Sequence, residues 1–138
     1  MNFVLDSSLA LAFVFKDEAS AATDRVLDSL GEGANAFVPA LWRWEIANAL
    51  LVAERRKRIV QADARRHLTH LENLPIEVDN AALDQVWTAT YLLAQKHRLS
   101  GYDAAYLEMA IRRAVSLGSL DRGLRAAAEA ESVSLLPL

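Results

Sequence analysis

The chain has no cysteine, and glycine and proline are scarce, with five and three residues among 138. The absence of thiols excludes disulfide bonds and thiolate chemistry. No apolar run approaches the ~20 residues that a membrane-spanning helix needs. Positive charge is not in excess either, because the formal net charge is -3. A nucleic acid would therefore have to bind through a local basic patch or a bound cation, since the overall field of the protein would not attract it.

The rest of the composition is that of an ordinary globular protein. Hydrophobic residues make up 53% of the chain and charged residues 24%, which is enough apolar material for one buried core and excludes a disordered chain. The first 22 residues contain an apolar stretch, but Asp6 interrupts it and no basic residue precedes it, so we expect no secretory leader. We expect a single domain over residues 1–138 that is cytoplasmic and makes no contact with a membrane.

Short apolar runs alternate with helical patterns along the chain. The runs at 3–5, 36–39, 76–78, 114–117 and 133–136 predict strands. Helical spacing is found at 9–15, 19–30, 41–58, 62–73, 81–97 and 102–113, and Asp121 can cap one more helix. Strands that alternate with helices favour an α/β fold, in which helices cover both faces of a mainly parallel sheet of about five short strands.

Four carboxylates stand at the ends of these predicted elements. Asp6 follows the first strand, Glu45 lies at the start of the helix after the second strand, Asp103 lies in the first turn of its helix, and Asp121 follows the fourth strand. The carboxyl ends of parallel strands share one edge of a sheet, so the four side chains can converge there. Their repulsion would then require a cation, and oxygen ligands suit Mg²⁺ or Mn²⁺.

Each of the three aspartates has a simpler interpretation, because aspartate is also a favoured helix cap. Capping does not explain Glu45. The segment 41–53 around it is apolar nearly all round, which is typical of a buried helix, and an isolated carboxylate is costly in a core. Asn48 lies one turn further on and can orient Glu45 or contact a ligand. The alternative is a buried polar pair that only fixes the packing.

Other candidate sites are weaker. His67, His70 and His97 supply one pair at helical spacing and no third ligand, so we expect no zinc site. Several basic runs are candidates for a phosphate-binding patch, but basic residues near helix ends also interact well with the helix dipole, and solvated helix ends are the commoner case. These candidates are residues 54–58, Arg65, Arg66, Arg112, Arg113, Arg122 and Arg125.

The four segments that hold the acids resemble the PIN-domain family and, within it, the VapC toxins of bacterial and archaeal toxin-antitoxin pairs. The segments read FVLDSSLAL, WEIANAL, LSGYDAAYLEMA and GSLDRGLRAAA. They occur in the order typical of the family and span nearly the whole chain. The resemblance implies a three-layer α/β/α fold and a metal-dependent ribonuclease that leaves a 5′-phosphate, in which Asp6, Asp103 and Asp121 bind Mg²⁺ or Mn²⁺ and Glu45 holds a water or a second ion.

The resemblance also implies supporting residues and partners. Ser119 stands where many relatives have threonine, and it keeps the hydroxyl. The implied partners are an RNA substrate, a VapB-type antitoxin that presents a basic side chain to the acidic site, and a second copy of the chain in a homodimer. Trp42, Trp44 and Ile46 are expected in the core or at an interface, because aromatics at this spacing more often pack than stack on bases.

Two other functions are compatible with the sequence. The first is a housekeeping PIN-type nuclease that processes RNA without an antitoxin, and an antitoxin gene immediately upstream would argue against it. The second is a non-catalytic binding module whose acid cluster is structural, which detection of metal binding and RNA cleavage would exclude. The sequence names neither the RNA nor the position of the cut, because RNA is recognised largely by shape.

Overall fold

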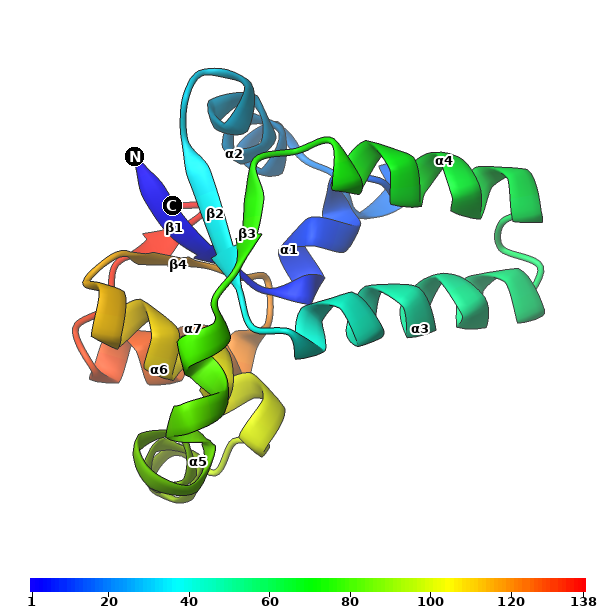
Figure 1. Ribbon diagram of the computed structural model, residues 1–138. Helices are drawn as coiled ribbons and strands as arrows, with labels where there is room; N and C mark the ends of the chain where they lie inside the picture. Colours follow the sequence, from blue (N-terminus) through cyan, green and yellow to red (C-terminus); the bar gives the residue numbers. More distant parts are fainter.

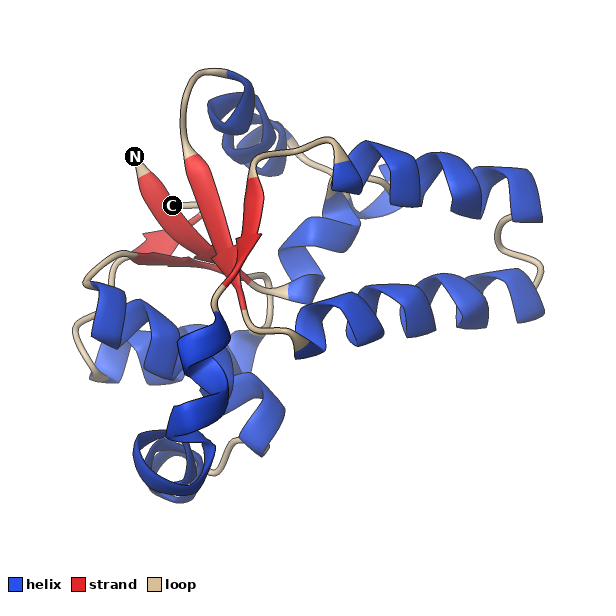
Figure 2. Cartoon of the chain, viewed as in Figure 1, coloured by secondary structure: helices blue, strands red, loops and turns tan.

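A computed structural model describes all 138 residues and places a five-stranded sheet at the centre of the molecule (Figures 1 and 2). Every neighbouring pair of strands is parallel, in the order β3-β2-β1-β4-β5. The predicted α/β fold is therefore confirmed, and the sheet is parallel throughout. The strands are β1 (Asn2–Leu5), β2 (Asn35–Val38), β3 (Ile76–Val78), β4 (Ser116–Gly118) and β5 (Leu135–Leu136).

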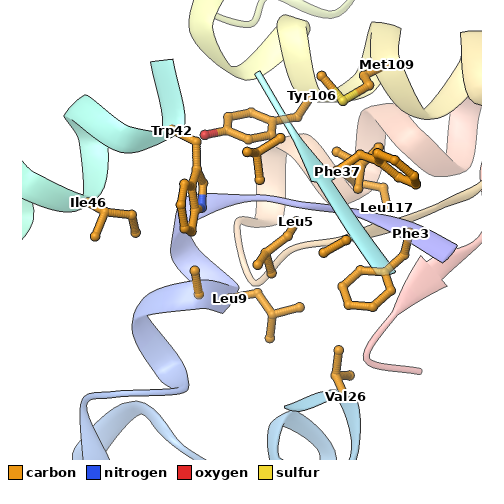
Figure 3. Close-up of a cluster of buried hydrophobic side chains, with 14 of the residues drawn as sticks. Phe3, Leu5, Leu9, Val26, Phe37, Trp42, Ile46, Tyr106, Met109 and Leu117 are labelled. Atoms are coloured by element: carbon orange, nitrogen blue, oxygen red, sulfur yellow. The ribbon is translucent and has the colours of Figure 1, made fainter. Parts of the chain in front are cut away.

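Helices cover both faces of the sheet, which confirms the three-layer arrangement. Figure 3 shows Leu9 and Val26 on one side of the strands and Tyr106 and Met109 on the other. None of the helices is long and apolar enough to cross a membrane. They are α1 (Ser7–Ala12), α2 (Ala21–Gly31), α3 (Leu41–Arg55), α4 (Gln61–Glu72), α5 (Tyr91–His97), α6 (Gly101–Arg113) and α7 (Arg122–Ala130), with the short 3-10 helices η1 (Lys16–Glu18) and η2 (Asn80–Gln85) and the π-helix η3 (Val86–Thr90).

The strand order reverses between β1 and β4. From β1 the chain adds β2 and then β3 on one side, and it then crosses back to add β4 and β5 on the other side. The helices that follow β1 and β4 therefore diverge, as α1 and α7 do in Figure 1. In open parallel sheets, ligands bind at the carboxyl ends of the strands at such a point. Asp6 and Asp121 immediately precede α1 and α7.

The segment predicted as one helix over 81–97 is instead three elements, η2, η3 and α5. The Asp79 carboxylate accepts hydrogen bonds from the backbone N–H groups of Ala81 and Ala82, which tightens the first turns. β-branched residues at 86, 88 and 90 then disfavour a regular α-helix. The strand predicted over 114–117 also begins later, at Ser116, because Ala114 adopts a left-handed conformation with φ 54 that ends α6.

The prediction that α3 is buried nearly all round is wrong. Together α3 and α4 form a hairpin that projects from the sheet (Figure 1). One side of α3 packs on α1 and α4, whereas no further layer covers its outer side. On this outer side Trp44 is 73% exposed and Leu51 45% exposed. The buried residues of α3 are Trp42, Ile46, Leu50 and Ala53.

Gly118 of β4 packs closely against α1 and β1. A Cβ atom at this position would lie 2.8 Å from Leu9 Cδ2 and 3.2 Å from the carbonyl oxygen of Val4. We expect Gly118→Ala to lower the free energy of unfolding by about 1 to 3 kcal/mol, because neither the backbone nor the packed leucine can give way cheaply. Gly31→Ala is the matched control, since a Cβ there meets nothing within 4 Å. Urea unfolding measures both, and equal stability of the two variants would contradict the prediction.

Candidate active site

Asp6 lies at the carboxyl end of β1 and is only 4% exposed. Its backbone N–H donates to the carbonyl oxygen of Gly118 at 2.9 Å, which extends the pairing of β1 with β4. Its Oδ2 accepts hydrogen bonds from the hydroxyls of Ser8 at 2.6 Å and Ser119 at 2.7 Å. No basic side chain pairs with Asp6. A buried carboxylate is thus held in place by neutral donors, and its charge is left uncompensated.

Ser119 connects Asp6 to Asp121. The Ser119 side chain is fully buried, and its Oγ accepts a hydrogen bond from the backbone N–H of Asp121 at 3.0 Å. The Oδ2 atom of Asp121 in turn accepts from the N–H of Leu124 at 2.8 Å, so Asp121 caps α7. Asp121 is itself exposed. One of its oxygens serves the helix, and the other has no hydrogen-bond donor within the chain.

Glu45 stands in the first turns of α3 and is paired with a tyrosine of α6. The Tyr106 hydroxyl donates to Glu45 Oε1, and Figure 3 shows this hydroxyl directed toward α3. Burial is the main cause that raises the pKa of Glu45, and the charges of Asp6 and Asp103 raise it further. Burial likewise raises the pKa of Tyr106, so the tyrosine stays a protonated donor.

Asp103 lies in the first turn of α6, where its backbone N–H donates to the Ser100 hydroxyl at 3.0 Å. The carboxylate is half-buried. Burial raises its pKa, and the charges of Asp6 and Asp121 add to the effect. Asp6 and Asp103 thus affect Glu45, and Asp6 and Asp121 affect Asp103, so the predicted carboxylates lie near one another at the carboxyl edge of the sheet.

The structure differs from the sequence interpretation at two residues, Asn48 and Tyr106. Asn48 is exposed, and its side chain makes no hydrogen bond within the chain, so it is not what orients Glu45. That role belongs to Tyr106, which sequence reasoning missed. The available signal was a lone phenol in the apolar run that follows Asp103, three residues further along the same helix.

The acid set fits a hard divalent cation in its chemistry. None of the four carboxylates forms an ion pair, and oxygen donors are the ligands that Mg²⁺ and Mn²⁺ prefer. No three His, Cys, Asp or Glu side chains stand in a ready coordination shell, however. Asp6 and Asp121 each use Oδ2 in hydrogen bonds to the protein. The residues therefore match the ion in charge and donor type without a preformed shell.

Several of the basic candidates are used inside the fold. Arg113 and Arg112 bind the buried Asp79 at 2.6 and 3.0 Å, and Arg112 also binds the buried Glu108 at 2.6 Å. Arg125 donates to the carbonyl oxygen of Ser119 at 2.9 Å. These arginines have structural partners, so the phosphate-binding interpretation does not apply to them.

The sequence model of the PIN domain family matches residues 3–130, and the chain belongs to this family. The fold is that of solved VapC toxins, as the resemblance implied. A search of curated protein sequences found no match. Three solved structures illustrate the likeness.

PAE2754 from Pyrobaculum aerophilum is 26% identical, with a TM-score of 0.70 over 98% of this chain and 83% of that one. VapBC2 from Rickettsia felis, solved bound to a DNA fragment from its own promoter, is 11% identical, with a TM-score of 0.68. The match covers 98% of this chain and 97% of that one. VapC20 from Mycobacterium tuberculosis, a sarcin-ricin loop cleaving toxin, is 15% identical, with a TM-score of 0.61 over 91% and 94%. The last two likenesses concern the fold alone.

Because the acids are crowded, we expect Asp103→Asn to increase the stability of the folded protein to an extent that depends on pH. The folded-state pKa of Asp103 is raised, so its ionisation weakens the fold above that pKa, and the penalty disappears as the pH falls to the ordinary value of 3.8. In EDTA the variant should be more stable than the wild type at pH 7, and the two should converge toward pH 4. Thermal unfolding over this range measures the difference. A variant less stable than wild type at pH 7 would contradict the prediction.

Proposed function

We propose that this protein is a metal-dependent ribonuclease that hydrolyses RNA phosphodiester bonds and acts as the toxin of a type II toxin-antitoxin pair. One observation carries the proposal: four carboxylates without a basic partner gather where the strand order of a PIN domain reverses. Membership of the family supports nuclease chemistry. The shared fold with VapC20, which cleaves the sarcin-ricin loop, supports RNA as the substrate.

The family resemblance supplies the proposed roles of the residues, and their contacts support them. Asp6, Asp103 and Asp121 would hold Mg²⁺ or Mn²⁺, which when bound offsets their charge, activates the attacking water and stabilises charge on the reacting phosphate. Ser8 and Ser119 fix the orientation of Asp6 by donating to one oxygen. Supporting groups of this kind hold ligating carboxylates in their productive rotamer.

Glu45 has a different role from the three aspartates. Tyr106 binds one of its oxygens, which leaves the other for a water molecule or a second ion. Its raised pKa also makes it an acid that can take up and release a proton closer to neutral pH than an exposed glutamate. Asn48 is exposed one turn further along α3, and we propose that it contacts the RNA.

Loss of a single negative charge should abolish cleavage. Asp6→Asn and Asp103→Asn keep the size of the side chain but remove the anionic ligand, so we expect RNA cleavage to fall more than about 100-fold in Mn²⁺. Asp28→Asn, on the exposed side of α2, is the control and should cleave like the wild type. Gel analysis of labelled RNA with Mn²⁺ or with EDTA measures the rates.

The same proteins test whether the cluster binds the ion. Mn²⁺ should raise the melting temperature of the wild type and of Asp28→Asn, because an ion bound only by the folded state stabilises it. It should not raise that of Asp6→Asn. Cleavage at the wild-type rate by both acid variants would refute the proposed site.

An antitoxin is the second proposed partner. The likeness to VapBC2 supports such a partner, and the acid cluster has charge that no side chain of this chain offsets. A basic side chain of the antitoxin can bind these carboxylates by charge-assisted hydrogen bonds. Antitoxin and divalent cation should then compete for the cluster.

Asp121→Asn tests this contact while keeping the fold, because asparagine also caps a helix well. The variant should bind the cognate antitoxin more weakly by about 1 to 3 kcal/mol. Excess Mn²⁺ should weaken binding by the wild type. Titration calorimetry measures both effects. Equal affinity of the two proteins, with no effect of Mn²⁺, would mean that the antitoxin inhibits by covering another surface.

A homodimer is also proposed, and exposed apolar side chains support it. Leu83, Trp87 and Tyr91 follow one another at intervals of four residues along η2, η3 and α5, and they are 79%, 91% and 57% exposed. Leu92 beside them is 63% exposed. Apolar patches of this kind on a protein surface mark interaction sites. The outer side of α3, with Trp44 and Leu51, is a second exposed apolar surface.

A further inference from the structure

Positive charge gathers at the free end of the α3–α4 hairpin. Residues 55–66 contain six of the fifteen Lys and Arg residues of the chain and a single acid, Asp63. Figure 1 shows this end of the hairpin pointing away from the sheet. We refer to it as the basic tip. Its six residues are Arg55, Arg56, Lys57, Arg58, Arg65 and Arg66.

Two of these six cations have partners within the protein. Arg58 binds Asp17 at 2.8 Å and Glu18 at 2.9 Å, which ties the tip to η1. Arg66 pairs with Asp63. The other four are exposed and form no ion pair, so their charge is available to a ligand; they are Arg55, Arg56, Lys57 and Arg65.

The basic tip is continuous with the acidic site along α3. Glu45, Asn48, Val52 and Arg56 are three or four residues apart, a spacing that places them along one side of the helix. At 1.5 Å per residue, the rise from Glu45 to Arg56 is about 16 Å. An RNA with its scissile bond at the acids can therefore extend along α3 to the tip within a few nucleotides.

The backbone at the tip also bears on its role. Lys57, two residues after the end of α3, adopts a left-handed conformation with φ 57. Glycine takes up this conformation without steric cost and is the usual residue after a helix end. A lysine at this position keeps a cation at the apex of the hairpin, although its backbone conformation has a steric cost that glycine would avoid.

The chemistry of the surface favours a polyanion over a protein. A shallow hollow along α4, next to the tip, is lined by polar side chains without an apolar one. Protein interfaces have an apolar centre, whereas no apolar side chain lines this hollow. Its lining residues are Arg65, Arg66, His67, Thr69 and His70.

We infer that the basic tip binds the phosphate backbone of the RNA substrate at a distance from the cleaved bond, and so positions the RNA over the acids. The inference rests on the proposed function. It also accounts for RNA binding by a protein whose net charge is -3, because the attraction is local. Contacts to phosphates fix register and affinity and carry no direct sequence information.

Salt dependence of RNA binding tests the inference. The probe is a short fluorescent RNA hairpin, whose anisotropy is followed in EDTA over a series of KCl concentrations, with a gel to show that the RNA stays intact. Arg56→Gln and Arg65→Gln should each lower the slope of log affinity against log salt by about one, whatever the RNA sequence. The matched control is Arg25→Gln, an exposed arginine of α2 without an ion pair, which should leave the slope unchanged.

Lys57→Gly separates the effect of charge on RNA binding from an effect on the stability of the fold. It removes a cation but relieves the left-handed backbone, so RNA binding should weaken while the melting temperature stays equal or rises. Equal salt slopes for Arg56→Gln, Arg65→Gln and Arg25→Gln would overturn the inference. So would tip variants that bind RNA normally but lose affinity for the antitoxin. Tip-dependent binding of RNA that the wild type does not cleave in Mn²⁺ would instead refute the proposed nuclease and leave the binding surface standing.

Discussion

The hydrogen bond from the Ser119 hydroxyl to the Asp6 carboxylate joins the ends of β1 and β4, the two strands at which the strand order reverses. The same hydroxyl accepts from Asp121, which caps α7. Gly118 allows the close approach that this chain of contacts needs, because a side chain there would meet Leu9 and the backbone of Val4. The same hydrogen bonds thus join β1 to β4 and position the acidic site. A substitution that disturbs the pairing of these strands therefore also disturbs the acids.

The carboxylates that lie below the surface fall into two groups, one with basic partners and one without. Burial would raise the pKa of Asp79, but hydrogen bonds from Arg113 and Arg112 lower it below the usual value, and this carboxylate fastens α6 to the end of β3. Glu45 and Asp103 have no such partner, and their pKa values are raised. Compensated charge serves the structure, whereas the uncompensated charge of Glu45 and Asp103 costs stability, as charges at functional sites often do.

The sequence was sufficient to predict the order of the main strands and helices and the position of the acids at their ends. Strand and helix periods and the residues at element ends are local signals. It was insufficient wherever the outcome depended on distant neighbours. Tyr106 and Glu45 are 61 residues apart, so their hydrogen bond has no local signature. The exposure of Trp44 depends on whether another layer covers α3. The broken helix after β3 depends on the Asp79 side chain, which competes with regular helical turns.

The irregular segment formed by η2 and η3 begins the crossover from β3 to β4, which α5 and α6 complete. Only Ala82 and Thr90 are buried within it, so little apolar contact resists its local opening. The strands and α6, by contrast, are held by fully buried side chains. We therefore expect this segment to have lower local stability than the sheet, so that its amide protons exchange with solvent faster than those of the strands. The segment nevertheless packs on α6, the helix that carries Asp103 and Tyr106, so motion of its exposed aromatic residues can reach the acidic site through that helix.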